Sequence, residues 1–186
     1  MVFDSQMQRQ IMGHFGTGVT LVTTRSGEDI WAMTANAVLS LSLDPPRILV
    51  AVDRDNRMHT FLSKGKCFAV NVLTNKQKDI SNRFATPGPK DFSDLALTTG
   101  QTGAPILDEA LASLDCRVVE ILSGGDHDMF IGEPVAGELG EGQPLLFFCG
   151  KYVEIHTTPK TPPLWVWINV LTIVAVTGLL SILWAC

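Results

Sequence analysis

The chain has 186 residues, 46% of them hydrophobic, which is enough for one ordinary domain with its own core and some residues beyond it. Its net charge of −5 argues against nucleic acid as a partner, because binding to phosphate backbones relies on an excess of Lys and Arg. Its four cysteines stand far apart, so we expect buried thiols in a reducing compartment and neither disulfides nor a zinc site. The first residues lack an unbroken apolar stretch, which argues against a secretory signal and predicts a protein of the cytoplasm.

The predicted elements begin with a short helix. Ser5 and Gln8 fit a capping box, and apolar residues then recur every four positions as far as Phe15. We expect this helix to end near Gly16 or Gly18. Strands follow, because the next segments are rich in Val, Thr and Ile and are too closely spaced for crossover helices, which predicts antiparallel pairing. These segments are "VTLVTT", "DIWAMTANAVLSLSL", "RILVAVD" and "CFAVNVL".

The second half of the chain adds two predicted helices and a further set of strands. The segments "MHTFLSKG" and "NKQKDISNRFA" have the composition and apolar spacing of short helices, and an excursion interrupted by Gly and Pro follows over residues 86–107. Strand-like segments with tight turns then continue as far as residue 155. Together these patterns predict a mainly β domain over residues 1–155, a closed or split antiparallel barrel with a few surface helices.

Residues 156–186 are predicted to lie outside this domain. Residues 156–163, "HTTPKTPP", are polar and Pro-rich, as is typical of an extended linker. Residues 164–186 contain no charged side chain, and at about 1.5 Å per residue a helix of this length spans the roughly 30 Å hydrocarbon layer. We therefore expect a transmembrane helix that anchors the protein by its tail, with the catalytic domain in the cytoplasm. The alternatives are a buried C-terminal helix and a tail joined to the domain by a gene-model error.

His127 stands between Asp126 and Asp128, which raises the question of a metal site or a catalytic base. The four histidines of the chain show none of the spacings that are typical of zinc sites, so we expect no metal. The sequence also lacks the G-x-S-x-G pattern of hydrolases, the G-x-G-x-x-G pattern of Rossmann domains and the P-loop pattern. The remaining candidates are polar residues at the edges of the predicted strands.

A rigid corner turns two of these strands back on each other. Pro46 after Pro45 sets the direction of the chain, so the second strand returns beside the first and brings "TANA", residues 34–37, near "AVDRDN", residues 51–56. Backbone groups and small hydroxyls in such a groove suit a flat heteroaromatic ring with several donors and acceptors at its edge. The alternative is that Thr and Ser here simply suit strands and that Asn36 caps a turn.

Six segments of the chain stand in a specific order: "GHFGTGVTLVTT", "MTANAVLSLSLDPPRILVAV", "FAVNVL" with "SNRFA" after it, "LDCRV", "GGDHDMFIGEPV" and "PLLFFCGKY". In this order they resemble the flavin reductase-like, FMN-binding split-barrel family, which includes the small reductase components of two-component flavin-dependent monooxygenases. The resemblance covers about residues 5–155. It implies a Greek-key split β-barrel, usually a homodimer with flavin bound near the subunit interface.

The resemblance also implies roles for particular residues. His127, in the G-D-H pattern, is expected beside the face of the flavin where the nicotinamide stacks. Hydride transfer takes no proton from the donor carbon, so His127 is expected to orient the nicotinamide or to donate a hydrogen bond rather than act as a base. Residues expected to line the isoalloxazine ring are Thr34, Ala35, Asn36 and Ala37; those of the flavin groove are Ser40, Asp53 and Asn56; those near the phosphate are Ser81, Arg83 and Phe84. For Arg83, a solvated arginine on a helix surface is the alternative.

The function implied by the resemblance is an NAD(P)H-dependent flavin reductase. It would transfer a hydride from NADH or NADPH to FMN or FAD and supply reduced flavin to a partner monooxygenase. Asp128 makes the rim of the site more acidic, which favours NADH over NADPH. Two alternatives stay open: a membrane-tethered flavin-binding electron carrier or sensor without free-flavin reductase activity, and a barrel that binds haem through His127, His14 or His59.

Overall fold

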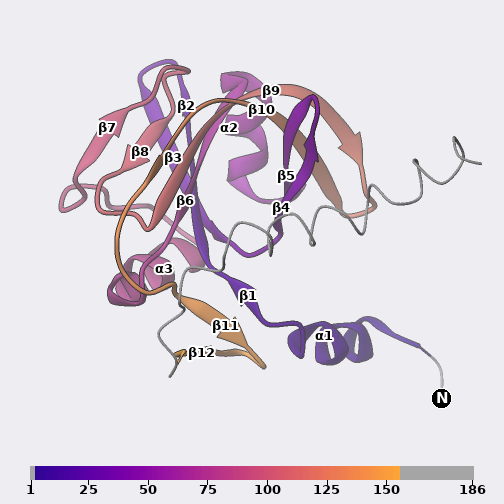
Figure 1. Ribbon diagram of the computed structural model, residues 1–186. Coiled ribbons are helices and arrows are strands. Elements are labelled where there is room, and N and C mark those ends of the chain that lie inside the picture. The colour runs from indigo at the N-terminus through magenta and orange to yellow at the C-terminus, as the bar shows by residue number, and fades with distance from the viewer. Residues whose placement is uncertain (1–2, 156–186) are drawn as a thin grey trace, which may run out of the picture. The chain divides into compact units, whose positions relative to one another are not determined.

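The computed structural model describes residues 3–155, and their main feature is a seven-stranded antiparallel sheet (Figure 1). In order across the sheet, the strands are β3 (Asp29–Ala35), β2 (Thr20–Ser26), β6 (Cys67–Val72), β9 (Ala112–Ser123), β10 (His127–Leu139), β5 (Pro46–Asp53) and β4 (Val38–Leu43). The edge strands β3 and β4 are consecutive in the chain but are not neighbours in the sheet, so the curved sheet stays open between them. The prediction of a mainly β, antiparallel domain is confirmed.

Two smaller sheets accompany the main sheet. The first, in the order β1-β11-β12, joins β1 (Thr17–Gly18), β11 (Leu146–Phe148) and β12 (Lys151–Val153). The second pairs β7 (Leu97–Thr99) with β8 (Pro105–Leu107). This hairpin lies within the segment that the sequence predicts to be an irregular excursion. The hairpin was not predicted, because strands this short show too little alternation of apolar and polar residues.

Helix α2 (Arg57–Gly65) packs within the curve of the main sheet (Figure 1). Its apolar face buries Met58 and Leu62 in a hydrophobic cluster that includes Phe68 of β6 and Phe130 of β10. Full burial of one large apolar side chain contributes about 1.5–3 kcal/mol. The cluster therefore fixes α2, and with it the turn that connects α2 to β5.

Helix α3 (Lys78–Ala85) follows the short 3-10 helix η1 (Asn75–Gln77) and lies at one end of the sheet (Figure 1). It buries Phe84 in a second hydrophobic cluster, together with Leu21 of β2 and Leu73. Both helices were predicted from their apolar spacing, and the burial of their apolar faces explains why that spacing identified them.

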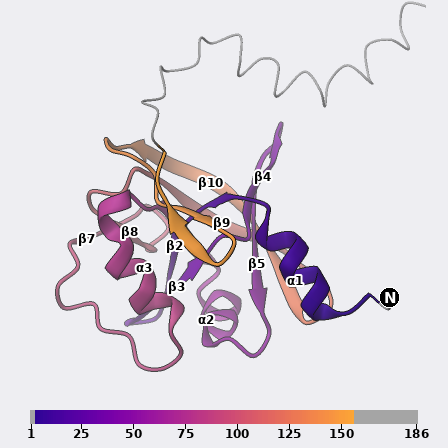
Figure 2. The ribbon, with the colours of Figure 1, turned by 90° about the horizontal axis from the view of Figure 1, so that it is seen from below.

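Helix α1 (Ser5–Gly13), near the N-terminus, lies below the main sheet in Figure 1 and in front of it in Figure 2, which is the view from below. Its cap is Asp4, whose carboxylate accepts a hydrogen bond of 2.8 Å from the amide of Met7, rather than the predicted Ser5. The helix also ends earlier than predicted. None of its residues is buried: Ile11 is 58% exposed and Phe15, just beyond its end, is 67% exposed. The apolar face that predicts this helix is therefore uncovered in the single chain.

The connection from β4 to β5 forms the predicted corner, with a cis peptide bond between Asp44 and Pro45. The predicted single strand over residues 29–43 is divided by a bend at residues 36–37. Beyond the bend, β4 pairs antiparallel with β5, and the amide of Ala51 donates to the carbonyl of Ala37 over 3.0 Å. The expected proximity of "TANA" and "AVD" is confirmed.

The cysteines only partly follow the prediction. Cys67 and Cys116 are buried free thiols, and burial, followed by the charge of Asp115, raises the pKa of Cys116 to about 12. Cys149 is exposed instead, because it lies in the turn between β11 and β12 rather than in a strand.

The predicted membrane-anchored localisation requires correction. Within residues 3–155, no helix is both long enough and apolar enough to cross a membrane. The predicted linker, 156–163, and the predicted transmembrane helix, 164–186, lie outside the described residues.

Candidate functional site

A cavity of about 310 Å³ opens between β3, the turn after β5 and the C-terminal end of α3. This volume falls at the lower end of the range for small-ligand sites. Three residues predicted to bind flavin line it: Asp53, Asn56 and Phe84. The cavity combines aromatic and apolar walls with two cationic side chains and two carboxylates, those of Asp53 and Asp55. The lining residues that the sequence did not indicate include Trp31, Met33, Arg57, Thr86 and Lys90.

Asp53 and Asn56 belong to the tight turn from β5 into α2. The carboxylate of Asp53 accepts a hydrogen bond of 2.8 Å from the amide of Asp55, and its carbonyl accepts one of 3.0 Å from the amide of Asn56. Asn56 then caps α2, since its side-chain oxygen accepts from the amide of Met58 over 2.9 Å. The side-chain oxygen of Asn56 is thus used by the helix, and its NH2 group is what the residue offers to a ligand.

Arg57 lies over two aromatic rings at the wall of the cavity. Its guanidinium carbon is 4.4 Å from the ring centroid of Trp31 and 5.5 Å from that of Phe61. The two rings stack on each other with their centroids 5.6 Å apart. Cation–π contacts of this kind hold the guanidinium in place, so a permanent positive charge is available to an anionic part of a ligand.

Thr34 and Ser81, which the resemblance places at opposite ends of the flavin, are bonded to each other. The hydroxyl of Thr34 donates to the carbonyl of Ser81 over 2.6 Å, which ties β3 to α3. The Ser81 hydroxyl shares a hydrogen bond of 2.8 Å with the hydroxyl of Tyr152, which also donates to Asn82 over 3.0 Å. Ser81 is fully buried. Its place in the structure is therefore between helix and sheet, and the sequence did not single out Tyr152, its partner.

Arg83 is engaged by a carboxylate. Its guanidinium binds both carboxylate oxygens of Asp94, one of them at 2.8 Å, and donates to the carbonyl of Asp91 over 3.2 Å. The hydrogen bond with Asp94 raises the pKa of Arg83 and holds the pKa of the Asp94 carboxyl below its usual value. Arg83 does not line the cavity with Phe84. The phosphate clamp predicted for Arg83 therefore stays a prediction that requires an exchange of partners.

Lys90 supplies a second positive charge at the cavity. Its ammonium group donates to three carbonyls at the end of α3, those of Arg83 at 3.3 Å, Phe84 at 3.4 Å and Thr86. These carbonyls have no partner within the helix, so a cation caps them favourably. Burial lowers the pKa of Lys90. The only signal for this residue in the sequence is the concentration of Lys and Arg between residues 54 and 90.

Asn36 and Ser40 line a second hollow, of about 440 Å³, which also includes Phe15 and Gly16 next to α1. The side-chain NH2 of Asn36 donates to the hydroxyl of Thr17 over 3.2 Å, so the alternative of a purely structural role for this residue has a specific partner. Ala35 is buried at the end of β3, and Ala37 lies just before β4. The four residues from 34 to 37 thus connect the hollow near α1 with the strand that borders the cavity.

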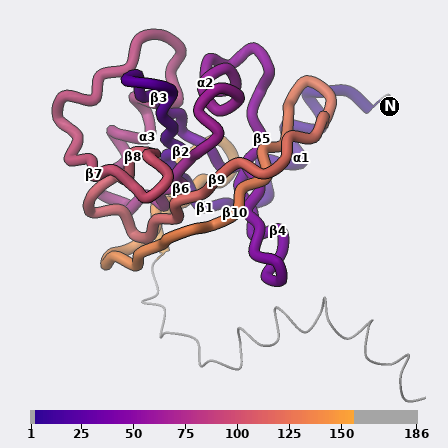
Figure 3. The backbone as a smooth tube through the Cα atoms, turned by 90° about the horizontal axis from the view of Figure 1, so that it is seen from above, coloured from indigo at the N-terminus to yellow at the C-terminus, as the bar shows by residue number. Residues whose placement is uncertain are grey.

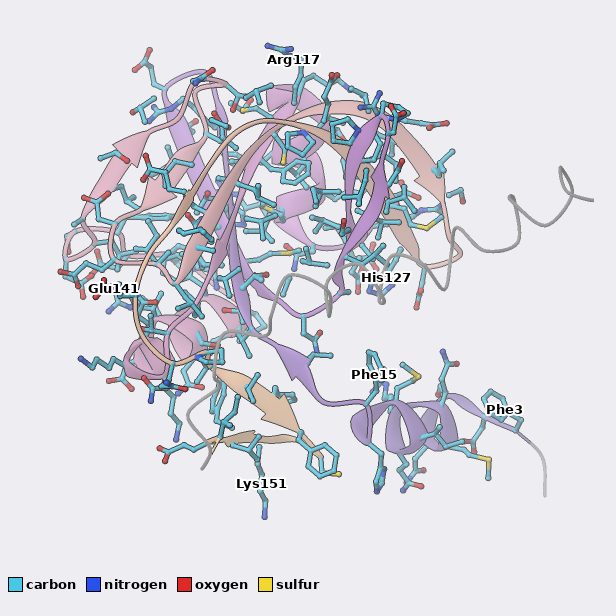
Figure 4. The ribbon with its side chains drawn as sticks, viewed as in Figure 1. Phe3, Phe15, Arg117, His127, Glu141 and Lys151 are labelled. Atoms are coloured by element: carbon cyan, nitrogen blue, oxygen red, sulfur yellow. The ribbon has the colours of Figure 1, made fainter. Side chains whose placement is uncertain are left out.

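His127 is the first residue of β10, directly after a turn at the tip of the long β9–β10 hairpin. It pairs with Asp53 of β5 in the sheet register, which brings it to the edge of the predicted flavin groove. Its side chain is 44% exposed and lies on the side of the sheet that faces α1 in Figure 4. The ring Nδ1 donates to the carboxylate of Asp126 over 2.8 Å. Gly125, with φ of +99°, allows the tight turn before it.

Asp128 is not a free charge on the rim. Its carboxylate accepts from Arg54 at 2.7 and 2.8 Å and from His59 at 2.8 Å. The expected repulsion of a phosphorylated nucleotide by Asp128 thus loses its basis. His59 is occupied by this contact, and His14 bonds the carbonyl of Gln10 over 2.8 Å. Within residues 3–155, no three His, Cys, Asp or Glu side chains are grouped in a way that could hold a metal ion.

Comparison with known proteins identifies the family of this chain. Residues 12–156 match the family described as "Flavin reductase like domain". The reductase component of 4-nitrophenol 4-monooxygenase/4-nitrocatechol 2-monooxygenase from Rhodococcus opacus is 38% identical over 84% of this chain and 83% of its own length. FMN reductase (NADH) RutF 2 of Rhizobium rhizogenes is 36% identical over 81% of this chain and 88% of its own length. The solved structure of the NADH:FAD oxidoreductase SgcE6 from Streptomyces globisporus has a TM-score of 0.78 and 34% identity, with 84% of this chain and 98% of that chain covered.

The family model covers most of the chain, so the chain belongs to the flavin reductase-like family. The predicted family, the β fold type and the enzyme class of flavin reductase-type oxidoreductase are confirmed. The ligands predicted for the chain, a flavin and NADH, are the ones named for these relatives.

Proposed function

We propose that this chain transfers a hydride from NADH to FMN or FAD at the cavity beside Asp53. One observation carries the proposal. The pairing of β5 with β10 sets His127 opposite Asp53, and Asp53 itself lines the cavity. The residue expected to contact the nicotinamide and a residue expected to contact the flavin are therefore held on adjacent strands, as a stacked pair of ligands requires.

The lining of the cavity fits a flavin. Trp31, Met33 and Phe84 offer apolar and aromatic surface to the ring, and Arg57 and Lys90 offer positive charge to a phosphate. Bound flavin supplies the redox chemistry, since it accepts the hydride of NADH as a two-electron carrier. The protein contributes the shape of the site and the orientation of both ligands.

His127 orients the nicotinamide without removing a proton from the donor carbon. Its hydrogen bond to Asp126 places a proton on Nδ1, so the Nε2 of the neutral ring is an acceptor. The carboxamide NH2 group of a nicotinamide is a suitable donor to that nitrogen. The Asp126 carboxylate thus sets the tautomer of His127, and this contact in turn holds the pKa of Asp126 low.

The test is a stopped-flow measurement with the purified protein, FMN or FAD, and NADH. We expect flavin absorbance to bleach under anaerobic conditions at a rate that depends on the concentration of protein. If none of FMN, FAD and riboflavin is reduced at saturating NADH, the proposal is wrong. Tight flavin binding without reduction would instead indicate a flavin-binding electron carrier.

We further propose that reduced flavin leaves this chain for a partner monooxygenase. The support is that a relative covering most of the chain is itself named the reductase component of a monooxygenase. Reduced flavin that is released reacts with oxygen in solution, so an excess of free flavin should undergo many turnovers for each protein molecule. A single turnover followed by retained, reduced flavin would contradict release.

We also propose that the chain forms a homodimer through the face that includes α1 and β4. Met12 of α1 and Phe15 just beyond its end are exposed, and Leu39, Leu41 and Leu43 are each 48–60% exposed on β4. An apolar surface of this kind on a monomer is typical of a protein interface. Light scattering should give twice the chain mass, and Leu41→Lys should reduce it to one chain mass. A wild-type monomer at micromolar concentration would exclude the dimer.

A further inference from the structure

The tip of the β9–β10 hairpin is gripped by one arginine from the neighbouring strand. The guanidinium of Arg54, just after β5, donates to the hydroxyl oxygen of Ser123 on β9. It also binds the carboxylate of Asp128 on β10, with N–O distances of 2.7 and 2.8 Å. Its backbone amide donates to the carbonyl of Asp126 over 3.1 Å. Arg54 thus holds the segment before the turn, the turn itself and the segment after it. In Figure 3 the hairpin runs along β5 and ends in this turn.

A second contact connects the same carboxylate to helix α2. The Nε2 of His59 donates to Asp128 over 2.8 Å, and the ring of His59 meets that of Phe130 edge-on, with the centroids 5.3 Å apart. Phe130 is fully buried in the core, so His59 has a fixed position. Side chains alternate along a strand, so Asp128 and Phe130 share the face packed on α2 and His127 points to the other face.

We propose that Arg54, Asp128 and His59 form a positioning network that fixes His127 relative to the cavity. Arg54 follows directly after Asp53, which lines the cavity. His59 lies in the first turn of α2, three residues after the helix cap Asn56, which also lines the cavity. None of the three residues of the network is predicted to touch the flavin or the nicotinamide. They act through the backbone of the hairpin tip, which carries His127 at its end.

The sequence alone places these residues far apart. Arg54 and Asp128 are brought together only by the register of β5 on β10, in which Val52 pairs with Asp128. The contact pattern also differs from an ordinary surface ion pair. Asp128 has a side-chain exposure of 16% and receives donors from a strand end and from a helix, so its position is defined from two sides.

This inference rests on the proposed function, and its consequence is a loss of hydride transfer without a loss of flavin. With Arg54→Met, the tip loses the two side-chain contacts that Arg54 makes, with Ser123 and with Asp128, and keeps only the contact of Asp128 with His59. His127 then moves relative to the nicotinamide. We expect the rate of flavin reduction at saturating NADH to fall on the order of 10- to 100-fold, because displacements of about 1 Å have effects of that size. The dissociation constant of FMN should change by less than about twofold, since the cavity lining is intact. Arg54→Lys, which keeps the charge but not the fork, should restore only part of the rate.

The matched control is Arg47→Met. Arg47 lies at the other end of β5, pairs with Glu133 of β10 at 3.9 Å, and is roughly 20 Å along the strand from the hairpin tip. The substitution Arg47→Met removes an arginine–carboxylate pair between the same two strands and leaves the contacts of the hairpin tip intact. Both the reduction rate and the FMN affinity of this variant should stay within about twofold of wild type. Equal losses of rate in Arg47→Met and Arg54→Met would overturn the inference.

Hydrogen–deuterium exchange separates this inference from the proposed function. Arg54→Met, and the milder Ser123→Ala if the first variant does not fold, should raise amide exchange in residues 123–128, whereas Arg47→Met should not. If the wild type does not reduce flavin but this pattern of exchange appears, the proposed function fails and the network stands. If exchange in residues 123–128 is unchanged in Arg54→Met and in Ser123→Ala, the network does not position the tip and the inference is wrong.

Discussion

Two arginine–aspartate pairs lie next to the cavity, and they differ in how firmly the fold holds them. Arg54 and Asp128 join adjacent strands, and the side chain of Asp128 is 16% exposed. Arg83 and Asp94 join α3 to the loop after it, and Asp94 is 58% exposed. An isolated exposed pair contributes about 0–1 kcal/mol, because water screens it and both side chains lose freedom. The first pair is therefore suited to a fixed support, and the second to an exchange of partners.

Under the proposed function, this difference gives the two ends of the site separate tasks. The hairpin tip must hold His127 in one place, since a hydride moves only between correctly stacked rings. The end near α3 is where the flavin phosphate is predicted to enter and leave, and a guanidinium that binds a carboxylate with two hydrogen bonds can bind a phosphate in the same geometry. Tight anchoring is needed at the first end and would slow release at the second.

The largest effect is expected from substitution of His127 itself. If Arg54 and Asp128 act only by positioning His127, their substitution cannot lower the rate of flavin reduction by more than this. His127→Ala should lower the rate of flavin reduction on the order of 100-fold, with FMN affinity within about twofold of wild type. His127→Gln keeps a polar group of similar reach and should recover part of the rate. Stopped-flow reduction and a fluorescence titration of FMN measure the two quantities.

A double variant then tests whether Arg54 acts through His127. If Arg54 only positions this ring, adding Arg54→Met to His127→Ala should cause little further loss of rate, because residues that act as a unit are not additive. If the loss of rate in the double variant equals the product of the two single losses, Arg54 affects the reaction by a route other than His127. The Arg54–Asp128 pair would then not be a support for His127.

A smaller effect is expected from the exposed pair. Asp94→Asn frees Arg83 from its carboxylate partner, so FMN should bind up to about fivefold more tightly, in keeping with the modest strength of surface ion pairs. Riboflavin, which lacks the phosphate, is the control ligand, and its affinity should not change. Calorimetric titration of both ligands makes the comparison. Weaker binding of FMN to Asp94→Asn would mean that the pair supports the loop wall and does not compete with phosphate.

The parts of this picture that follow from the sequence are those that depend on local pattern. Helices α2 and α3 have apolar faces that a core must cover, and the Pro-Pro corner returns β5 beside β4, so both were predictable. The face of α1 was predicted as well, although its cover is absent from the single chain. The predicted cap, Ser5, is one residue away from the observed cap, Asp4. Asp and Ser are both favourable cap residues, so residue type alone could not distinguish between them.

The contacts that shape the site could not be predicted, because they depend on the register of distant strands. His127 lies opposite Asp53 only because β5 pairs with β10 in this register. For Arg83, the phosphate role stays a prediction, but its partner within the chain, Asp94 on the loop after α3, could not be foreseen from the sequence. The stacking of Arg57 on Trp31 likewise joins residues from separate elements, and no spacing along the chain indicates it.

The smallest effect concerns stability in acid, and it compares the two pairs directly. Hydrogen bonds lower the carboxyl pKa of Asp128, from Arg54 first and then from His59, and that of Asp94, from Arg83. A carboxyl whose folded pKa lies below its unfolded value of about 3.9 adds stability above that pH and loses this contribution as the pH falls through the folded pKa. The melting temperature should therefore drop as the pH is lowered below about 4. Asp128→Asn should remove more of this drop than Asp94→Asn, since Asp128 is less exposed and receives two side-chain donors. Equal slopes for the two variants in thermal melts from neutral to acid pH would show that the difference in burial has no energetic counterpart.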